Sequence, residues 1–380
     1  MLKDRRLRRA PVLLFVLSFV ALNAATAAWE SALKKKRRDN LMQPETIAQK
    51  VAGARYDGSV GTHLDAYWKA IPDARKQPLV ILAGMSQMYV INDRKPGDET
   101  ISEFLDDYYA RHNTRVFGLA APNLDNEEAL LMLLASLTAP ETTPRVFIYG
   151  ICFDKFRNVG VRQDLQKFAA SLHGFESSWR ALAHSAMAEY PLAAEAMQAS
   201  LGDVAAKPAT DSSFELRLRT RLASAVPLME SRVDLNGYFQ ERLYTLRNVV
   251  FRISSTTKRP ILQTRYDTNR EFLGLLADVA AASNVRLVVY VIPLNPRAET
   301  PYVPSQYESF KRWVSEFARA RDIPYANLEN AVPLDAWGLI QGAPDFKHFR
   351  EVGHRLAAAA IREQFDSVIL NPAPPRVSTR

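Results

Sequence analysis

Three residues of the types used in nucleophilic catalysis occur in two distant parts of the chain. Asp345 and His348 are separated by three positions, and a helical pattern opening with Gly353-His354 follows them. Ser86 comes much earlier, directly after an apolar run. A serine hydroxyl becomes a nucleophile when a histidine takes its proton and a carboxylate holds the tautomer of that histidine. The three side chains therefore predict a Ser-His-Asp triad in which Asp345 and His348 share the last loop.

Each of these residues also has a structural interpretation. Ser86 follows Gly84 as turn residues often do, Asp345 is suited to cap the last helix, and His348 is suited to the surface. The α/β-hydrolase elbow Gly-x-Ser-x-Gly does not fit, because Met88 stands where its final glycine belongs. Taken together, and in this order along the chain, the three residues favour catalysis.

The elements that must position them alternate between strand and helix. Strand-like apolar runs occur at Pro78–Ala83, Arg115–Leu119, Arg145–Tyr149, Arg286–Pro293 and Pro324–Leu328. Helical patterns occur at Thr100–His112, Asn126–Leu137, Thr268–Ser283, Ser305–Arg321 and Glu351–Phe365. This alternation predicts an α/β fold: a three-layer parallel sheet with helices on both faces, interrupted by a helical insert. Because ligands bind at the carboxyl ends of parallel strands, Ser86 lies where a site is expected.

The positive charge of the chain is confined to its beginning. The formal net charge is +8, and residues 1–38 carry ten Lys and Arg against two acidic residues, so the remainder is neutral. A neutral body argues against a broad phosphate-binding face, and no nucleic-acid partner is expected. The apolar stretch 11–29, flanked by basic residues, predicts a membrane anchor, with a cleaved signal peptide and secreted protein as the alternative.

The chain divides into four parts. Residues 1–29 are the signal-anchor or signal peptide, and 30–75 are a juxtamembrane stalk and lead-in helix. Residues 76–368 form the α/β domain, whose helical insert at about 157–252 is either a lid, a partner surface or structural padding. The proline-containing tail 369–380 is expected to be disordered.

The sequence carries no sign of a metal or cofactor site. Cys152 is the single cysteine, so no intramolecular disulfide forms, and it is expected to be a small buried hydrophobic residue. His354 is expected to pack at the start of the last helix. The other histidines have no metal-ligand spacing, and no glycine-rich phosphate loop is present.

Four stretches resemble sequence blocks of the SGNH (GDSL-like) hydrolase superfamily. Leu82–Gln87 resembles the first block, which carries the serine, and Arg115–Asn123 is similar to the second. Asp345–His348 together with Gly353–Ala357 resembles the last block. The third block of the superfamily reads Gly-x-Asn-Asp, whereas this chain has Gly-Ile-Cys-Phe-Asp at 150–154, without the Asn. The resemblance is to the membrane-anchored branch that acts in cell-envelope acylation, which includes D-alanine transfer proteins of teichoic acid synthesis.

The resemblance implies a role for each site residue. Ser86 attacks an acyl carbonyl, His348 takes its proton, and Asp345 orients His348. The backbone N–H groups of Ser86 and Asn123 stabilise the oxyanion. The Asn side chain that completes this site in the superfamily has no counterpart in the third block here.

The resemblance further implies an exported, membrane-tethered serine esterase or O-acyltransferase. Its substrate would be an acyl ester, acetyl above all, of a cell-envelope polysaccharide, processed through an acyl-enzyme on Ser86 without a cofactor. The expected location is the inner membrane, single-pass, with the body on the periplasmic side and a membrane-bound acyl donor protein as partner. The alternative is a catalytically weak SGNH-like module that binds polysaccharide or scaffolds an envelope assembly.

Overall fold

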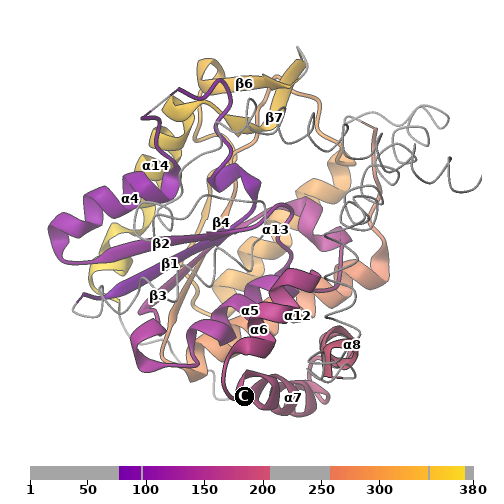
Figure 1. The fold of residues 1–380 in the computed structure, drawn as a ribbon. Coiled ribbons are helices and arrows are strands. Elements are labelled where there is room, and N and C mark those ends of the chain that lie inside the picture. Colours follow the sequence, from indigo (N-terminus) through magenta and orange to yellow (C-terminus); the bar gives the residue numbers. More distant parts are fainter. Residues whose placement is uncertain (1–76, 96, 206–256, 341–342, 373–380) are drawn as a thin grey trace, which may run out of the picture. The chain divides into compact units, whose positions relative to one another are not determined.

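A five-stranded parallel sheet forms the centre of the computed structural model, which describes residues 77–95, 97–205, 257–340 and 343–372 (Figure 1). Its strand order is β2-β1-β3-β4-β5. The strands are β1 (Leu79–Gly84), β2 (Arg115–Ala120), β3 (Val146–Ile151), β4 (Arg286–Val291) and β5 (Tyr325–Asn327). All five coincide with the predicted apolar runs, so the α/β fold class is confirmed. Every residue of β1 and β3 is buried, as expected for a parallel sheet covered on both faces.

Helices cover the two faces of this sheet (Figure 1). On one face α4 (Ile101–Tyr109) packs against α14 (Glu351–Leu370), and on the other α5 (Asn126–Ser136) packs against α12 (Gln263–Ala282). The connection to β5 runs through α13 (Pro304–Ala320). Right-handed crossovers explain this division, because the chain steps from β1 to β2 in one direction and then returns across β1 to β3.

The helical insert is described in part. Its first helices are α6 (Gln163–Ser171), α7 (Phe175–Ala186) and α8 (Pro191–Ala205), and the rest of the predicted stretch 157–252 lies outside the described residues. The segments 1–29 and 30–75 also lie outside them. Within the described ranges, every helix is too short or too polar to cross a bilayer.

The C-terminal helix is longer than predicted. α14 continues to Leu370, two residues into the stretch 369–380 that the sequence analysis assigned to a disordered tail. Burial of Ile369 against the core explains this extension, since the apolar periodicity of the helix includes it. Residues 373–380 lie outside the described part of the chain.

The last predicted loop is instead a β-hairpin. Strand β7 (Ala343–Phe349) pairs antiparallel with β6 (Trp337–Ile340), so the prediction that Asp345 and His348 share a loop was wrong. The pairing is irregular: Trp337 lies opposite Phe349 and Leu339 opposite Pro344. Residues 345–348 therefore bulge from the ladder opposite a single residue of β6. Such bulges re-aim side chains, which is what a site built on a strand requires.

Candidate active site

Ser86 lies at the carboxyl end of β1, in the first turn of the short 3₁₀ helix η1 (Ser86–Met88). The Ser86 carbonyl accepts the backbone N–H of Val90 at 2.8 Å, which closes the turn. A Cβ atom on Gly84 would stand 2.2 Å from Met88 Sδ, so glycine at this position lets Met88 fold back over the strand end. The chain thus turns sharply beneath Ser86 without the Gly-x-Ser-x-Gly elbow.

The three predicted catalytic side chains meet in one hydrogen-bonded chain. Ser86 Oγ lies 2.9 Å from His348 Nε2, and His348 Nδ1 lies 2.8 Å from Asp345 Oδ2. The partners are separated by 262 residues in the first contact and by three in the second. This is the relation of nucleophile, base and orienting carboxylate in a serine triad.

The environment of Asp345 fixes the tautomer of His348. The Asp345 side chain is 0% exposed, and burial acts to raise its pKa, but hydrogen bonds from His348, the Lys347 N–H and Asn92 outweigh burial and hold the pKa below its usual value. Asp345 is therefore an ionised acceptor, and an imidazole that carries a single proton holds it on Nδ1, facing this carboxylate. The lone pair on Nε2 then faces the Ser86 hydroxyl and is free to accept its proton.

Three amide side chains hold the bulged segment 345–348 in place. Gln87 Nε2 donates to the carbonyls of Pro293 and Lys347, both at 2.7 Å. Asn295 Nδ2 donates to the Asp345 carbonyl at 2.9 Å. Asn92 Nδ2 donates to Asp345 Oδ2 and to the His348 carbonyl, both at 3.1 Å. None of the three amides was predicted from the sequence, although Gln87 adjoins the serine and Asn295 follows β4.

Gly338 explains how Asn92 reaches the carboxylate. A Cβ atom built on Gly338 would lie 2.1 Å from the Asn92 Cβ atom, which real side chains do not tolerate. Because Gly338 is the residue of β6 opposite the bulge, the absence of a side chain there leaves the space that Asn92 occupies. The bulge, the glycine and the amide are thus parts of one arrangement.

Asn123 lies in the turn that follows β2, the neighbour of β1. Its φ is 53°, and the Leu124 N–H donates to the Ala121 carbonyl at 3.2 Å. Pro122 at the second position excludes the primed turns, so a positive φ at the third position defines a type II turn. The Ala121 N–H also donates to the Gly84 carbonyl at 3.2 Å, which ties the turn to the end of β1. The oxyanion role of the Ser86 and Asn123 N–H groups stays a prediction.

The segment directly after β3 reads Cys152-Phe153-Asp154-Lys155 and contains no amide residue. Cys152 is buried, and its sulfur lies 3.3 Å from the Tyr302 hydroxyl. Burial raises the pKa of the Cys152 thiol, in agreement with the predicted small hydrophobic role. The following Lys155 is unusual: its side chain is buried, and its ammonium has no hydrogen-bond partner among the described residues.

Replacing Lys155 by methionine is expected to stabilise the folded protein by about 1–3 kcal/mol at pH 7, because an unpaired buried charge is removed. Burial lowers the pKa of Lys155 from 10.5 to about 8. Below pH 8 the folded state must hold this unfavourable charge, whereas above the unfolded-state pKa neither state carries it. The advantage of the variant should therefore shrink as the pH rises from 8 toward 10. Urea unfolding of both proteins at pH 7 and pH 9.5 measures this, and a variant less stable at both values contradicts it.

Asp345 and His354 lie on either side of the start of α14, and the structure shows the role of each. Arg350, not Asp345, is the N-cap of α14, so the capping interpretation of Asp345 was wrong. His354 is fully buried; its Nδ1 accepts the Ile101 N–H at 3.2 Å and its Nε2 lies 3.1 Å from the Val90 carbonyl. Burial lowers the pKa of His354 to about 3, so this ring is a neutral packing residue, as predicted.

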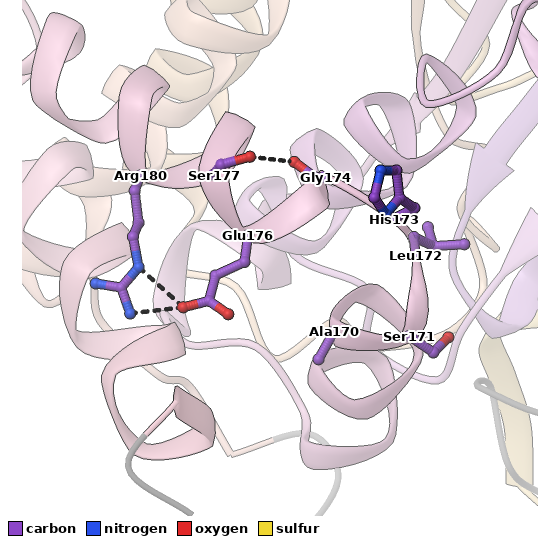
Figure 2. A pocket seen from close by; sticks show the side chains of 8 residues that line it. All are labelled: Ala170, Ser171, Leu172, His173, Gly174, Glu176, Ser177 and Arg180. Carbon is purple, nitrogen blue, oxygen red and sulfur yellow. Dashed lines mark hydrogen bonds and ion pairs between the residues drawn. The ribbon is translucent and has the colours of Figure 1, made fainter. Parts of the chain in front are cut away.

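Two other features lie apart from the triad. A hollow of about 610 Å³ is formed where α6 meets α7, and Figure 2 shows its lining, which includes the ion pair of Arg180 with Glu176 and no triad residue. Within the described ranges no group of three or more His, Cys, Asp or Glu side chains is arranged to hold a metal ion.

Comparisons with known proteins leave the family of the chain open. No protein-family model matches the sequence, and no curated protein matches it. Among solved structures, the chain is similar to a protein from Bacteroides fragilis described as a "putative acylhydrolase", at 8% identity and a TM-score of 0.37. The similarity covers 80% of this chain and 97% of that one. A TM-score this low carries no weight for fold or function.

Proposed function

We propose that the chain is a serine esterase or O-acyltransferase that works through an acyl-enzyme on Ser86. The observation that carries the proposal is the unbroken hydrogen-bonded chain from Ser86 Oγ through His348 to the buried Asp345 carboxylate. Ser86 and the distant pair Asp345 and His348 meet in the geometry that activates a hydroxyl. A structural serine and a surface histidine have no need of a buried carboxylate behind them.

The chemistry follows from the atoms in contact. Ser86 Oγ attacks the acyl carbonyl while His348 Nε2 takes the hydroxyl proton, and the carbonyl oxygen becomes an oxyanion held by the Ser86 and Asn123 N–H groups. Collapse of this intermediate breaks the ester bond, and the leaving alcohol takes the proton from His348. Water or an acceptor hydroxyl then attacks the acyl-enzyme, with His348 as base again, and releases the acid or the transferred ester.

The substrate and location are proposed from the sequence. The basic-flanked apolar stretch 11–29 supports a single-pass membrane protein, and a neutral body suits a polysaccharide substrate better than a nucleic acid. Because five Lys and Arg flank each side of the stretch, these charges do not fix its orientation, and the inner membrane with a periplasmic body is proposed from the resemblance to the membrane-anchored branch. We therefore propose acyl esters of a cell-envelope polysaccharide as substrates, supplied by a membrane-bound acyl donor protein. Cys152 in place of an oxyanion Asn favours the second candidate, a catalytically weak module that binds polysaccharide or scaffolds an envelope assembly.

Fluorophosphonate labelling of the purified full-length protein tests the proposal. An activated serine should take up one phosphonate per chain, and the tryptic peptide 77–94 has Ser86 as its only serine, so mass spectrometry assigns the adduct without ambiguity. Heat-denatured protein is the control, because labelling must depend on the folded triad. If the folded protein takes up no label, the acyl-enzyme proposal is wrong and the binding module replaces it.

A further inference from the structure

We propose that Arg162 is a positioning residue of the oxyanion site: its guanidinium holds the peptide between Pro122 and Asn123 so that the Asn123 N–H points toward the reacting carbonyl. This inference rests on the proposed acyl-enzyme function. It assigns a role to the first residues of the helical insert, which the sequence analysis left open between a lid, a partner surface and structural padding.

The contact that carries the inference is a hydrogen bond from Arg162 Nη2 to the Pro122 carbonyl oxygen, 2.8 Å long. The Pro122 carbonyl and the Asn123 N–H are the two ends of one peptide unit. In a planar trans peptide these groups point in opposite directions. A donor that holds the oxygen on one side therefore fixes the direction of the N–H on the other.

This peptide has a competing orientation that the contact disfavours. Type I and type II turns differ by a flip of the central peptide, and proline suits the second position of both. The type II form observed here places Asn123 at a φ of 53°, in the left-handed region that is unfavourable for a residue with a side chain. A hydrogen bond from a charged donor is among the stronger ones in proteins, and it acts against the cost of the left-handed conformation and keeps the flipped form rare.

Arg162 is itself held rigidly. Its Nε lies 2.6 Å from Glu128 Oε1 and its Nη2 lies 2.7 Å from Glu128 Oε2, a bidentate pair in which the Glu128 side chain is 3% exposed. Glu128 also accepts the Arg162 backbone N–H at 3.1 Å. Bidentate pairs fix orientation as well as distance. The guanidinium is therefore held in a set position rather than free to swing into solvent.

The ion pair of Arg162 with Glu128 is supported by the start of α5, which directly follows the turn. Asp125 caps α5 and accepts the Glu128 N–H at 2.9 Å, while Glu128 reaches back to the Asp125 N–H. Glu127 accepts the Gly160 N–H at 2.9 Å and thereby anchors the loop segment that leads to Arg162. Turn, capping box and insert thus form one polar cluster behind the Asn123 N–H.

The test compares Arg162→Met and Arg162→Lys with Arg180→Met as matched control, all in the full-length protein. Arg180 also forms a charged pair with a glutamate, Glu176, but on the exposed surface of α7 (Figure 2). For p-nitrophenyl acetate we expect Arg162→Met to lower kcat by about 10–100-fold, less than the loss of a whole oxyanion donor. KM should change less than about twofold, because the N–H is needed in the transition state more than in the substrate complex. Arg162→Lys should recover only part of the loss, because an ammonium cannot hold Glu128 bidentately.

Two further readouts separate positioning from folding. Phenylboronic acid forms a tetrahedral adduct on serine, so its Ki should rise in parallel with the loss of kcat. Millimolar guanidinium should restore part of the activity of Arg162→Ala, in which the space of the guanidinium is vacant, and should leave the activity of Arg180→Met unchanged. All rates are expressed per fluorophosphonate-titrated site.

The outcomes distinguish this inference from the proposed function. If the kcat per titrated site and the boronate Ki of Arg162→Met equal those of wild type, Arg162 is not a positioning residue although the acyl-enzyme stands. Arg162 is likewise not a positioning residue if the fraction of activity lost in Arg162→Met equals the fraction of sites that no longer react with fluorophosphonate. In that case Arg162 serves folding alone. If wild type is neither labelled nor active, the acyl-enzyme proposal falls and this inference falls with it.

Discussion

Replacing Ser86 by alanine is expected to lower the kcat for p-nitrophenyl acetate by roughly 10⁴–10⁶-fold, the range set by loss of the nucleophile in serine triads. Without the hydroxyl no acyl-enzyme forms, and His348 has no positioned nucleophile to deprotonate. The fold should not suffer, because the described contact of Ser86 Oγ is the one to His348 Nε2 and alanine fits the same turn. Steady-state kinetics and a melting curve on the purified variant measure both parts.

The matched control is Ser309→Ala. Ser309 lies on the exposed surface of α13, and its hydrogen bond within the described part of the chain runs along its own helix, to the Ser305 carbonyl at 2.9 Å. This variant should keep wild-type activity and labelling. Activity of Ser86→Ala within tenfold of wild type would show that the ester is cleaved elsewhere on the molecule and would remove Ser86 from the mechanism.

The sheet and the helices could be predicted because their signals are local. β1 and β3 are unbroken apolar runs, and α4 and α5 each begin with a capping box, at Thr100 and Asp125. Such patterns depend on neighbours within a few residues and on burial on both faces of a parallel sheet. The triad was also accessible, because the types and order of its members are chemically restrictive even before their contacts are known.

The hairpin that carries the triad could not be predicted in the same way. β7 contains Pro344 and Lys347 along with the two catalytic candidates, and it shows no alternation of apolar and polar residues. Its geometry comes from a bulge whose register is set by β6 and by distant side chains. Propensity therefore indicates a loop, and tertiary contacts override it.

The supporting amides were hidden for a related reason. Asn92 and Asp345 are 253 residues apart, and Gln87 reaches a carbonyl 260 residues away. Asn and Gln occur throughout any sequence, so nothing marks these two until the fold brings their partners to them. The same is true of Arg162, which resembles any helix-flanking arginine until it contacts the Pro122 carbonyl.

Replacing Asp345 by asparagine is expected to lower kcat by about 10²–10³-fold, less than the ~10⁴-fold cost of a wrong histidine tautomer in a Ser-His-Asp triad. Three donors converge on this carboxylate. Oδ2 receives the His348 Nδ1–H and Asn92, while Oδ1 receives the Lys347 N–H at 3.0 Å. The asparagine amide has one oxygen and can place it in either of two orientations. At the Oδ2 position this oxygen accepts from two donors, whereas at the Oδ1 position it accepts from one. The amide oxygen should therefore face His348, so that the tautomer survives and only the negative charge is lost.

Asn92 therefore decides the orientation of the amide in the Asp345→Asn variant. With Asp345→Asn and Asn92→Ala combined, each oxygen position has one donor, so the amide can turn its NH₂ group toward His348. His348 Nδ1 then accepts a hydrogen bond from this NH₂ group, and the imidazole proton moves to Nε2, where it prevents deprotonation of Ser86. We expect this double variant to lose about 10⁴-fold in kcat, against about tenfold for Asn92→Ala alone in which the carboxylate remains. The measurement is a double-mutant cycle on kcat, with melting curves for all four proteins. A single Asp345→Asn variant as inactive as the double would show that Asn92 does not select the orientation of residue 345, and the proposed ordering of donors around this carboxylate would be wrong.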